Sequence, residues 1–462
     1  MGQRHCDRAA SLQVLWLTTQ PPSLLLNNGA LIYSANLLRG TAELGASVEV
    51  ICRNSEPGRR SEPALASNIA WNVVRERSPP IIRRLLSSLP ASAAGYSTRS
   101  YAAAVESALR SRRWDAVVID GIWTGGYAAA VMACTNGIRP ALIYLAHNHQ
   151  SSMSALIARR HHGSRLLRFA MWLDAVKTAW LEARLTSACD LVVAITQEDA
   201  DRFRQQRPHG PIITVYPGHS RQTAAVPHFA QRKRRLLILG SFHWIVKRAN
   251  LEQFLSVAAQ RAHDANVEVY VVGAMAPDYQ RKLSKRFPTA VIVGPVEDFA
   301  PELAAARFGL VIDDCGGGFK LKVLDYAFGG VTIAGLRSAM LGTSLREGTH
   351  FLGADDCQSL IEKIITHIDD YDSMSQLSQR ALARFQSSTF DWHTSAGALV
   401  SGIVNAVRAK GVGEVTSSRA RTKPAPPPFP QSAQEDQRAF SVSCDEASIE
   451  QTPDAPSNVT RK

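Results

Sequence analysis

The sequence predicts an α/β protein that contains two Rossmann-like domains. Short apolar runs rich in β-branched residues alternate with helical stretches, a pattern typical of parallel βαβ units. The alternation runs once to about residue 218 and begins again at residue 234. A chain of 462 residues is long enough for two domains of ordinary size.

The individual elements follow from the same pattern. In the first half we expect a helix over 30–45 and strands over 12–19, 47–53, 115–121, 141–148, 190–196 and 212–218. In the second half we expect strands over 234–241, 267–273, 289–296, 308–314 and 330–335. The apolar period is lost over 219–233, so we place the domains at 1–225 and 226–405. Residues 411–462 are rich in Ser, Pro and charged residues, and we expect a disordered tail there.

Composition excludes several classes of protein. Hydrophobic residues make up 45% of the chain and charged residues 20%, as in ordinary globular proteins. No stretch approaches the roughly 18 uninterrupted apolar residues of a membrane span. The seven cysteines are scattered without a CxxC pair, which indicates reduced thiols in a cytoplasmic protein, with neither disulfides nor a zinc site.

The positive charge is concentrated in the first half. Residues 1–225 hold 25 Lys and Arg against 15 Asp and Glu, an excess of 10 out of a net charge of +12. Segments 79–89 and 155–180 carry much of it, and the second mixes arginines with Leu166, Phe169 and Trp172. This segment is either a basic amphipathic helix for anionic lipid headgroups or a surface helix whose apolar stripe packs into its own domain. No nucleic-acid-binding module accompanies the charge.

A glycine-rich segment, GGGFKLK, covers residues 316–322 and predicts an anion site. Gly316, Gly317 and Gly318 allow backbone amides to approach a ligand, and Lys320 and Lys322 add positive charge, so we expect a phosphate or diphosphate. The alternative is a glycine-rich turn with solvated lysines. Two residues apart on a helix, the lysines would point about 200° apart, so one of them is expected to be solvated.

Several segments resemble known motifs in the same order. LAHNHQ at 145–150, VYPGH at 215–219, LLILGSFHWIVKRANLEQFL at 236–255 and GPVEDF through GGVTIAG at 294–335 resemble segments of GT-B glycosyltransferases, the large retaining group called glycosyltransferases group 1. The resemblance covers residues 12 to about 405. It implies a GT-B architecture, with an acceptor in the amino-terminal domain, a nucleotide sugar in the carboxy-terminal domain and the reaction in the cleft. It also places the start of a helix near Ala249.

The resemblance assigns donor-binding residues. A departing diphosphate gathers negative charge, which backbone amides and cations can stabilise. The positions that match are Gly29, Gly240, Ser241, Lys247, Arg248, Gly316, Gly317, Gly318, Lys320, Lys322 and Asp325. Asp325 stands where the family has the second acid of a Glu-x7-Glu pair, which binds ribose, although it is also consistent with an exposed charge on a core helix. Gly317 replaces the first acid, which puts the usual contact to the donor sugar in doubt.

Catalytic candidates lie at the ends of two expected strands, where α/β sheets bind ligands. The resemblance places His147 next to the donor sugar, and Asp120 could contact the acceptor. No pair of carboxylates suggests the two-acid glycosidase scheme. We expect no metal and no cofactor besides a donor of the UDP or GDP type, and we interpret Asp313 and Asp314 as loop-capping residues.

Three functions are consistent with these features. The first is a retaining glycosyltransferase that builds a polysaccharide or glycolipid at the cytoplasmic face of a membrane. Its partners would be a nucleotide sugar, a glycan or lipid-linked acceptor and an anionic membrane surface, and it would be cytoplasmic and peripheral on the inner face of the plasma membrane. The second is a non-catalytic GT-B-like protein that binds a nucleotide sugar or a partner. The third is an epimerase of the same fold that acts on a UDP-amino sugar.

Overall fold

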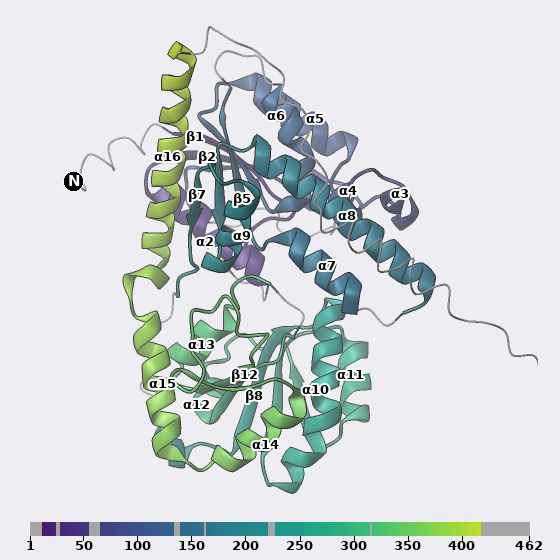
Figure 1. Ribbon diagram of the computed structural model, residues 1–462, viewed down its shortest axis with the longest axis vertical. Coiled ribbons are helices and arrows are strands. Elements are labelled where there is room, and N and C mark those ends of the chain that lie inside the picture. Colours follow the sequence, from purple (N-terminus) through teal and green to yellow (C-terminus); the bar gives the residue numbers. More distant parts are fainter. Residues whose placement is uncertain are drawn as a thin grey trace, which may run out of the picture. The chain divides into compact units, whose positions relative to one another are not determined.

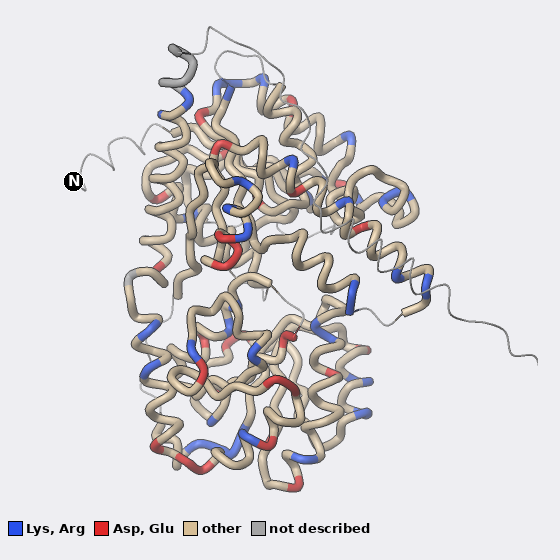
Figure 2. Tube along the Cα trace, viewed as in Figure 1, with Lys and Arg blue, Asp and Glu red and all other residues tan. Residues whose placement is uncertain are grey.

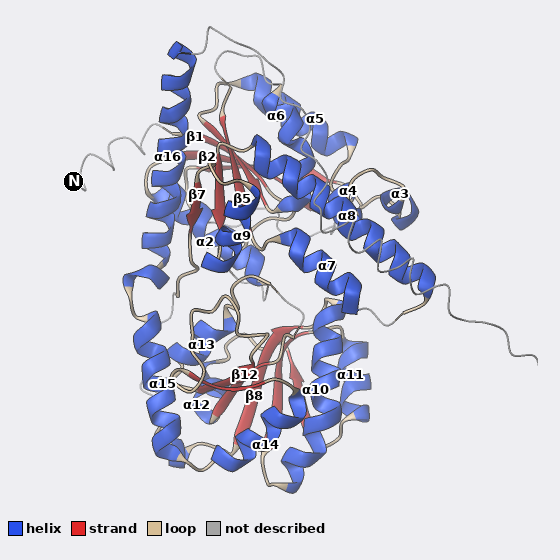
Figure 3. Cartoon of the chain, in the orientation of Figure 1, coloured by secondary structure: helices blue, strands red, loops and turns tan. Residues whose placement is uncertain are grey.

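A computed structural model describes residues 12–24, 28–54, 65–133, 139–160, 163–219, 227–314 and 317–416. The predicted α/β class is confirmed, because the described chain forms two separate parallel sheets flanked by helices (Figures 1 and 3). Both sheets belong to one compact unit that ends at Gly411. The disordered tail was expected from residue 411, but the last helix continues to Thr416, and the rest of the expected tail lies outside the described residues.

The first sheet has seven parallel strands in the order β3-β2-β1-β4-β5-β6-β7. Six of them were predicted, and the edge strand β3 was not. Its sequence, IAWNVVR, is interrupted by a polar residue and is only partly buried, so it lacks the continuous apolar run of a central strand. The strands are β1 (Gln13–Leu17), β2 (Ser47–Asn54), β3 (Ile69–Arg75), β4 (Ala116–Asp120), β5 (Ala141–Ala146), β6 (Leu191–Ala194) and β7 (Ile212–Thr214).

The second sheet has six parallel strands in the order β10-β9-β8-β11-β12-β13. All five strands that the apolar pattern predicted here are present. They are β8 (Arg235–Ser241), β9 (Glu268–Ala274), β10 (Ala290–Gly294), β11 (Phe308–Val311) and β12 (Thr332–Leu336), followed by β13 (Phe351–Ala354). Residues 220–226 between the sheets lie outside the described part of the chain, so the domain boundary at 225 stays a prediction.

Helices connect the strands of both sheets. Those that follow strands of the first sheet are α2 (Gly29–Glu43), α3 (Ile81–Leu85), α4 (Ala91–Ala94), α5 (Arg99–Ser111), η1 (Ile122–Tyr127), α6 (Ala128–Met132), α7 (Gln150–Arg160), α8 (Arg165–Ala188) and α9 (Gln197–Gln206). The remainder are η2 (Phe229–Gln231), α10 (Ile245–Asp264), α11 (Pro277–Arg286), α12 (Ala300–Ala305), α13 (Lys322–Phe328), α14 (Cys357–His367), α15 (Tyr371–Phe385), η3 (Ser388–Phe390) and α16 (Trp392–Thr416).

Two helices differ from the sequence-based expectation. Helix α10 begins at Ile245, one turn before the expected start near Ala249. The basic segment 155–180 contributes to two helices, α7 and α8, instead of one. Of the two alternatives, a stripe packed into the domain does not hold for the first half of α8, because the side chain of Leu166 is 79% exposed and that of Phe169 58%. Among the helices described, none is both long and apolar enough to cross a bilayer.

Helix α16 packs against the first sheet, although it follows the second sheet in the chain. The hydroxyl of Ser395 donates a 2.6 Å hydrogen bond to the carbonyl of Tyr216, and Nζ of Lys410 donates one of 2.8 Å to the carbonyl of Pro140. A Cβ atom added to Gly40 of α2 would lie 2.4 Å from Cβ of Ala396, so α2 and α16 are in close contact. The helices that cover the first sheet therefore include one from the end of the described chain.

The strand order creates one ligand-binding position in each sheet. In each order the chain winds outward from a central pair, β1 and β4 in the first sheet and β8 and β11 in the second. Connections leave such a pair toward opposite sides, which opens a crevice at the carboxyl ends of the strands. The residues after β1, β4, β8 and β11 are therefore the ones to examine for function.

Candidate functional site

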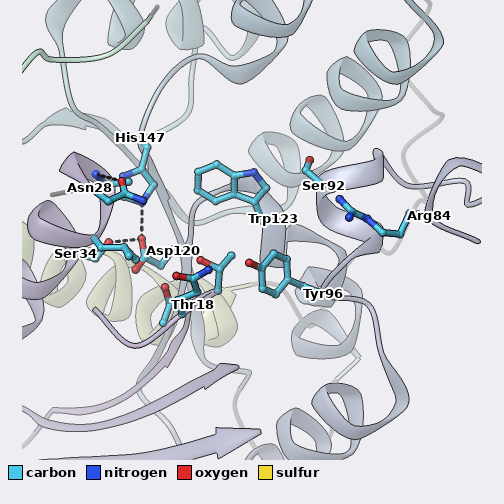
Figure 4. Close-up of a pocket in the computed structure, with 13 residues that line it drawn as sticks. Thr18, Asn28, Ser34, Arg84, Ser92, Tyr96, Asp120, Trp123 and His147 are labelled. Carbon is cyan, nitrogen blue, oxygen red and sulfur yellow. Dashed lines mark hydrogen bonds and ion pairs between the residues drawn. The ribbon is translucent and has the colours of Figure 1, made fainter. Parts of the chain in front are cut away.

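A cavity of about 320 Å³ lies at the carboxyl ends of β1 and β4. Figure 4 shows the residues that line it, with His147, Asp120 and Ser34 at one end and Ser92 and Arg84 at the other. Both predicted catalytic residues line this cavity. The full set is Thr18, Thr19, Gln20, Asn28, Ala30, Leu31, Ser34, Arg84, Ser92, Tyr96, Asp120, Trp123 and His147.

Asp120 ends β4 and is almost completely buried, and both of its carboxylate oxygens accept hydrogen bonds. Oδ2 accepts from Nε1 of Trp16 at 2.9 Å. Oδ1 accepts from the hydroxyl of Ser34 at 2.9 Å and lies 2.7 Å from Nε2 of His147. A buried carboxylate needs such partners to remain stable. Asp120 is therefore held in one position and is suited to orient His147.

His147 follows β5 and is oriented by the carboxylate of Asp120. Because the carboxylate accepts at Nε2, that nitrogen carries a proton, and in the neutral ring Nδ1 carries a lone pair. Nδ1 is buried and has no hydrogen-bond partner within the described structure. The rings of Tyr33 and Trp123 lie 5.8 and 5.9 Å from the imidazole. Among the described residues, Nδ1 is therefore a buried acceptor that no protein group satisfies.

The outer end of the cavity is formed by α3 and α4. Nε of Arg84 donates a 2.8 Å hydrogen bond to the carbonyl of Ala91, which fixes the guanidinium beside the start of α4. Ser92 and Tyr96 line the same end. The cavity therefore joins a His-Asp pair at one end to an arginine at the other.

The corresponding position in the second sheet is positively charged. Asp313 follows β11, and Nζ of Lys322 donates a 2.6 Å hydrogen bond to its Oδ2. The charges of Lys247 and Lys320 also act on this carboxylate. Three lysines thus surround Asp313 at the carboxyl ends of β8 and β11, and their combined charge exceeds that of the carboxylate.

Burial and neighbouring charges shift the pKa values in this cluster. Burial alone would raise the pKa of Asp313, but the charges of Lys322 and Lys247 bring it down to about 2. Burial lowers the pKa of Lys320 to about 8, and Asp313 opposes this shift only in part. The pKa of Lys247 is also lowered, first by burial and then by Lys322. Lysines that lose proton affinity in this way would be stabilised by a bound anion.

The two lysines of the glycine-rich segment do not point apart as expected. Helix α13 begins only at Lys322, so Lys320 lies in the preceding loop and the 200° argument does not apply. Lys320 donates to the carbonyls of Gly317 and Gly318 at 3.1 and 3.3 Å. The expectation that one of the two lysines is solvated is therefore wrong. Asp313 is better described as an ion-pair partner of these lysines than as a loop cap.

The glycines of this loop lie against the end of β5. A Cβ atom at Gly317 would lie 2.8 Å from Cε of Met153, and one at Gly318 would lie 2.6 Å from the carbonyl oxygen of His147. Gly318 also has a φ of 66°, a conformation that favours glycine. Gly316 lies outside the described residues. Gly318 is therefore required at its position, whereas Gly317 only meets the flexible end of the Met153 side chain.

The other predicted donor residues occupy varied positions. Gly240 and Ser241 end β8, as expected for a binding loop. Nε of Arg248 donates a 2.7 Å hydrogen bond to the carbonyl of Phe242, so Arg248 supports this loop. Gly29 begins α2, and a Cβ atom there would lie 3.3 Å from Leu321. Oδ1 of Asp325 lies 3.7 Å from Nε2 of His219, and its side chain is 26% exposed.

Some residues of the site were not identified from the sequence. Trp16 and Ser34 hold Asp120, and Arg84 lines the far end of the cavity. Ser34 could have been noticed as a polar residue inside an apolar helix, five positions after Gly29. Arg84 gave no signal beyond its place in a basic segment.

In the described ranges, no three His, Cys, Asp or Glu side chains gather where they could hold a metal ion.

Comparisons with known proteins agree with this geometry. Residues 28–218 match a family model described as glycosyl transferase 4-like domain. No curated protein sequence matches the chain significantly. Among solved structures, sucrose-phosphate synthase from Thermosynechococcus elongatus is similar with a TM-score of 0.66 and 14% identity, over 86% of this chain and 100% of that chain.

Two further structures extend the comparison. HepE of Anabaena, in complex with UDP and glucose, has a TM-score of 0.54 and 15% identity over 88% of this chain and 100% of its own. WaaG, a glycosyltransferase involved in lipopolysaccharide biosynthesis, has a TM-score of 0.58 and 14% identity over 84% of this chain and 100% of its own. At these identities the likeness shows the fold. Residues 28–218 thus match a glycosyl transferase 4-like domain, and the chain has the two-sheet fold of the GT-B glycosyltransferases.

Proposed function

We propose that this chain is a retaining, metal-independent glycosyltransferase. It transfers a sugar from a nucleotide-diphosphate donor of the UDP or GDP type to a polysaccharide or glycolipid acceptor at the cytoplasmic face of a membrane. The observation that carries the proposal is the cluster of Lys247, Lys320 and Lys322 around Asp313 at the carboxyl ends of β8 and β11.

The lysine cluster fits a diphosphate for electrostatic reasons. Three ammonium groups act on Asp313, Asp199 acts in addition on Lys320, and burial already lowers the pKa of Lys320 to about 8. An anion with two or more negative charges would neutralise the cluster and restore the proton affinity of the lysines. The same groups would stabilise the charge that builds up as the bond between sugar and diphosphate breaks. Structures of HepE, a protein of similar fold, contain UDP and UDP-glucose.

The cavity of the first sheet is proposed as the acceptor site. In the transfer, an acceptor hydroxyl oxygen forms the new glycosidic bond, the bond from the sugar to the diphosphate breaks, and the hydroxyl proton passes to the departing diphosphate. His147 would place its Nδ1 near the reacting carbon, and Asp120 would hold the ring. Asp120 itself is not suited to attack the sugar, because both of its oxygens already accept hydrogen bonds.

A second candidate function rests on Gly317. The resemblance places at this position a glutamate that contacts the donor sugar, and this chain has glycine there. A protein without this contact could bind a nucleotide sugar and not transfer it. The alternative is therefore a non-catalytic GT-B-like binding protein.

Binding and turnover separate these functions. Thermal unfolding would be followed with UDP, GDP and ADP, for the wild type, Lys320→Ala and the control Lys282→Ala, which removes an exposed lysine of α11. A rise in Tm with one nucleotide, lost only in Lys320→Ala, is the expected result. If no nucleotide raises the Tm, the proposed donor site is wrong.

The release of nucleotide from its sugar conjugate is the second measurement. Release that depends on an added acceptor supports transfer, and retention at the anomeric carbon can then be read by NMR of the product. Release without acceptor points to the epimerase or to hydrolysis. Binding without release supports the non-catalytic alternative.

A further inference from the structure

Helix α8 carries large apolar side chains on a solvent-exposed face. Leu166 is 79% exposed, Phe169 58% and Trp172 52%. At 100° per residue, positions 166, 169, 172, 173, 176 and 180 fall within an arc of about 120°. The buried residues of α8, among them Leu181 and Leu185, lie on the opposite side. The helix therefore presents one apolar stripe to the domain and another to solvent.

Helix α3 extends this exposed face. Ile81, Ile82 and Leu86 are 56%, 69% and 82% exposed. Nζ of Lys177 in α8 donates to the carbonyls of Leu85 and Ser87 at 2.9 and 2.7 Å, and so fastens the end of α3 to α8. We call the result the α3–α8 surface, defined by Ile81, Ile82, Leu86, Leu166, Phe169 and Trp172.

Exposed apolar side chains are concentrated here and not spread over the molecule. Seventeen large hydrophobic side chains are exposed among the described residues, and eleven of them belong to α3, its C-cap or α8. Single exposed apolar residues are normal, but a contiguous group marks a binding surface. This concentration of exposed apolar side chains indicates a partner with an apolar surface.

The charge of the surface indicates the kind of partner. Helix α3 contains Arg83 and Arg84 and no acid, and α8 begins with Arg165 and Arg168 in its first turn (Figure 2). The one acid in the first half of α8, Asp174, accepts a 2.6 Å hydrogen bond from the amide of Ala91. Apolar side chains flanked by arginines complement a lipid surface with anionic headgroups.

The same surface adjoins the cavity of the first sheet. Arg84 belongs to α3 and also lines the outer end of the cavity, whose inner end contains Asp120 and His147. An amphiphilic acceptor can therefore leave its lipid in the bilayer at α3 while its polar head reaches into the cavity.

We propose that the α3–α8 surface binds the face of an anionic lipid bilayer and that the acceptor is lipid-linked and enters the cavity past Arg84. The proposal rests on the proposed glycosyltransferase function, since it names the source of that enzyme's acceptor. Binding requires both parts of the surface, with the apolar side chains entering the interface and the arginines attracting the headgroups.

Vesicle sedimentation of the full chain tests this surface. The probes are vesicles of phosphatidylcholine alone and vesicles with about 30% phosphatidylglycerol, and the variants are Phe169→Ser with Trp172→Ser, and Arg165→Gln with Arg168→Gln. Wild type should partition at least tenfold more strongly onto the anionic vesicles. The apolar variant should lose at least tenfold, and the arginine variant about thirtyfold, at about fivefold per charge.

Matched control variants change exposed residues of the second half of the chain, far in sequence from α3 and α8. Val291→Ser with Leu341→Ser removes two exposed apolar side chains, and Lys282→Gln with Lys285→Gln removes two exposed charges. Both should bind vesicles like the wild type. Equal binding to the two kinds of vesicle, or an equal loss in the controls, would overturn the proposal. A change in oligomeric mass instead of vesicle binding would assign the surface to a second copy of the chain, and would also overturn it.

Nucleotide binding keeps this test separate from the test of the proposed function. The surface variants should retain the Tm of the wild type and its rise with UDP, which shows that they are folded. A wild type that binds vesicles and no nucleotide would remove the donor site and leave the surface. A wild type that binds UDP and no vesicles would overturn the membrane-binding surface and leave the donor site.

Discussion

Nζ of Lys322 donates a 2.6 Å hydrogen bond to Oδ2 of Asp313, and both groups are largely buried. This pair fixes one carboxylate at the carboxyl end of β11, close enough to Lys247 and Lys320 for their charges to lower its pKa. Even with Asp199, whose charge also acts on Lys320, the three ammonium groups outnumber the carboxylates. The cluster therefore has a built-in preference for a multiply charged anion.

Replacing Lys320 should weaken nucleotide binding strongly. A charge-assisted hydrogen bond to a buried partner contributes about 1.5–3 kcal/mol, so we expect the Kd for UDP to rise roughly 10–150-fold in Lys320→Ala. Isothermal titration calorimetry provides the measurement. Lys282→Ala, on the exposed face of α11, should leave the Kd as it is. An unchanged Kd in Lys320→Ala would place the phosphates elsewhere.

Nucleotide binding should weaken as the pH rises through 8. The pKa of Lys320 is lowered to about 8, so its ammonium group is present below that pH and lost above it. The diphosphate stays fully ionised over this range, because the last phosphate pKa is near 6. We expect the Kd for UDP to rise about tenfold between pH 7 and 9. In Lys320→Met the same titration should be flatter, and an equally steep profile would assign the effect to another group.

Asp120→Asn should lower turnover more than donor affinity. The amide cannot accept hydrogen bonds from Trp16, Ser34 and His147 in the way the carboxylate does, so the orientation of His147 is lost. A loss of roughly 10²-fold in kcat is expected, with little change in the Kd for UDP. Asp115→Asn, at the opposite end of β4, is the matched control. Equal kcat values in the two variants would remove Asp120 from the site.

Two glycine substitutions test the packing of α16 on the first domain. In Gly40→Ala the new Cβ would meet Cβ of Ala396 at 2.4 Å, whereas nothing lies within 4 Å of a Cβ at Gly397. We expect Gly40→Ala to lower the free energy of unfolding by about 1–3 kcal/mol through overpacking. Gly397→Ala should raise it by about 0.5–1 kcal/mol through helix propensity. Urea denaturation measures both, and a stabilised Gly40→Ala would mean that the two helices separate easily.

The sequence predicted the sheets well because buried parallel strands are continuous apolar runs. The strands ending at Asp120 and before His147 were recognisable in this way, and their ends are where the cavity lies. The edge strand β3 lacks such a run and was missed. Which strand neighbours which is not encoded locally, and the pairing of β1 with β4 is a property of the whole sheet.

Side-chain partnerships were harder to predict than positions. Lys320 and Lys322 were identified, but their directions depended on where α13 begins, and it begins at Lys322 and so excludes Lys320. Trp16 and Ser34 come from different elements and meet at Asp120 only in the folded domain. The return of α16 to the first sheet also has no local signal, because its contacts are with residues far away in the chain.

The contact between α2 and α16 has a consequence for synthesis on the ribosome. The first domain cannot cover Gly40 and the residues around it until α16 has left the exit tunnel, long after β7. At 5–20 residues per second, the wait is roughly 10–40 s, during which one face of a nearly complete domain is uncovered. A nascent chain that stalls within the second sheet would therefore present this face to chaperones, and release of α16 would end their access to it.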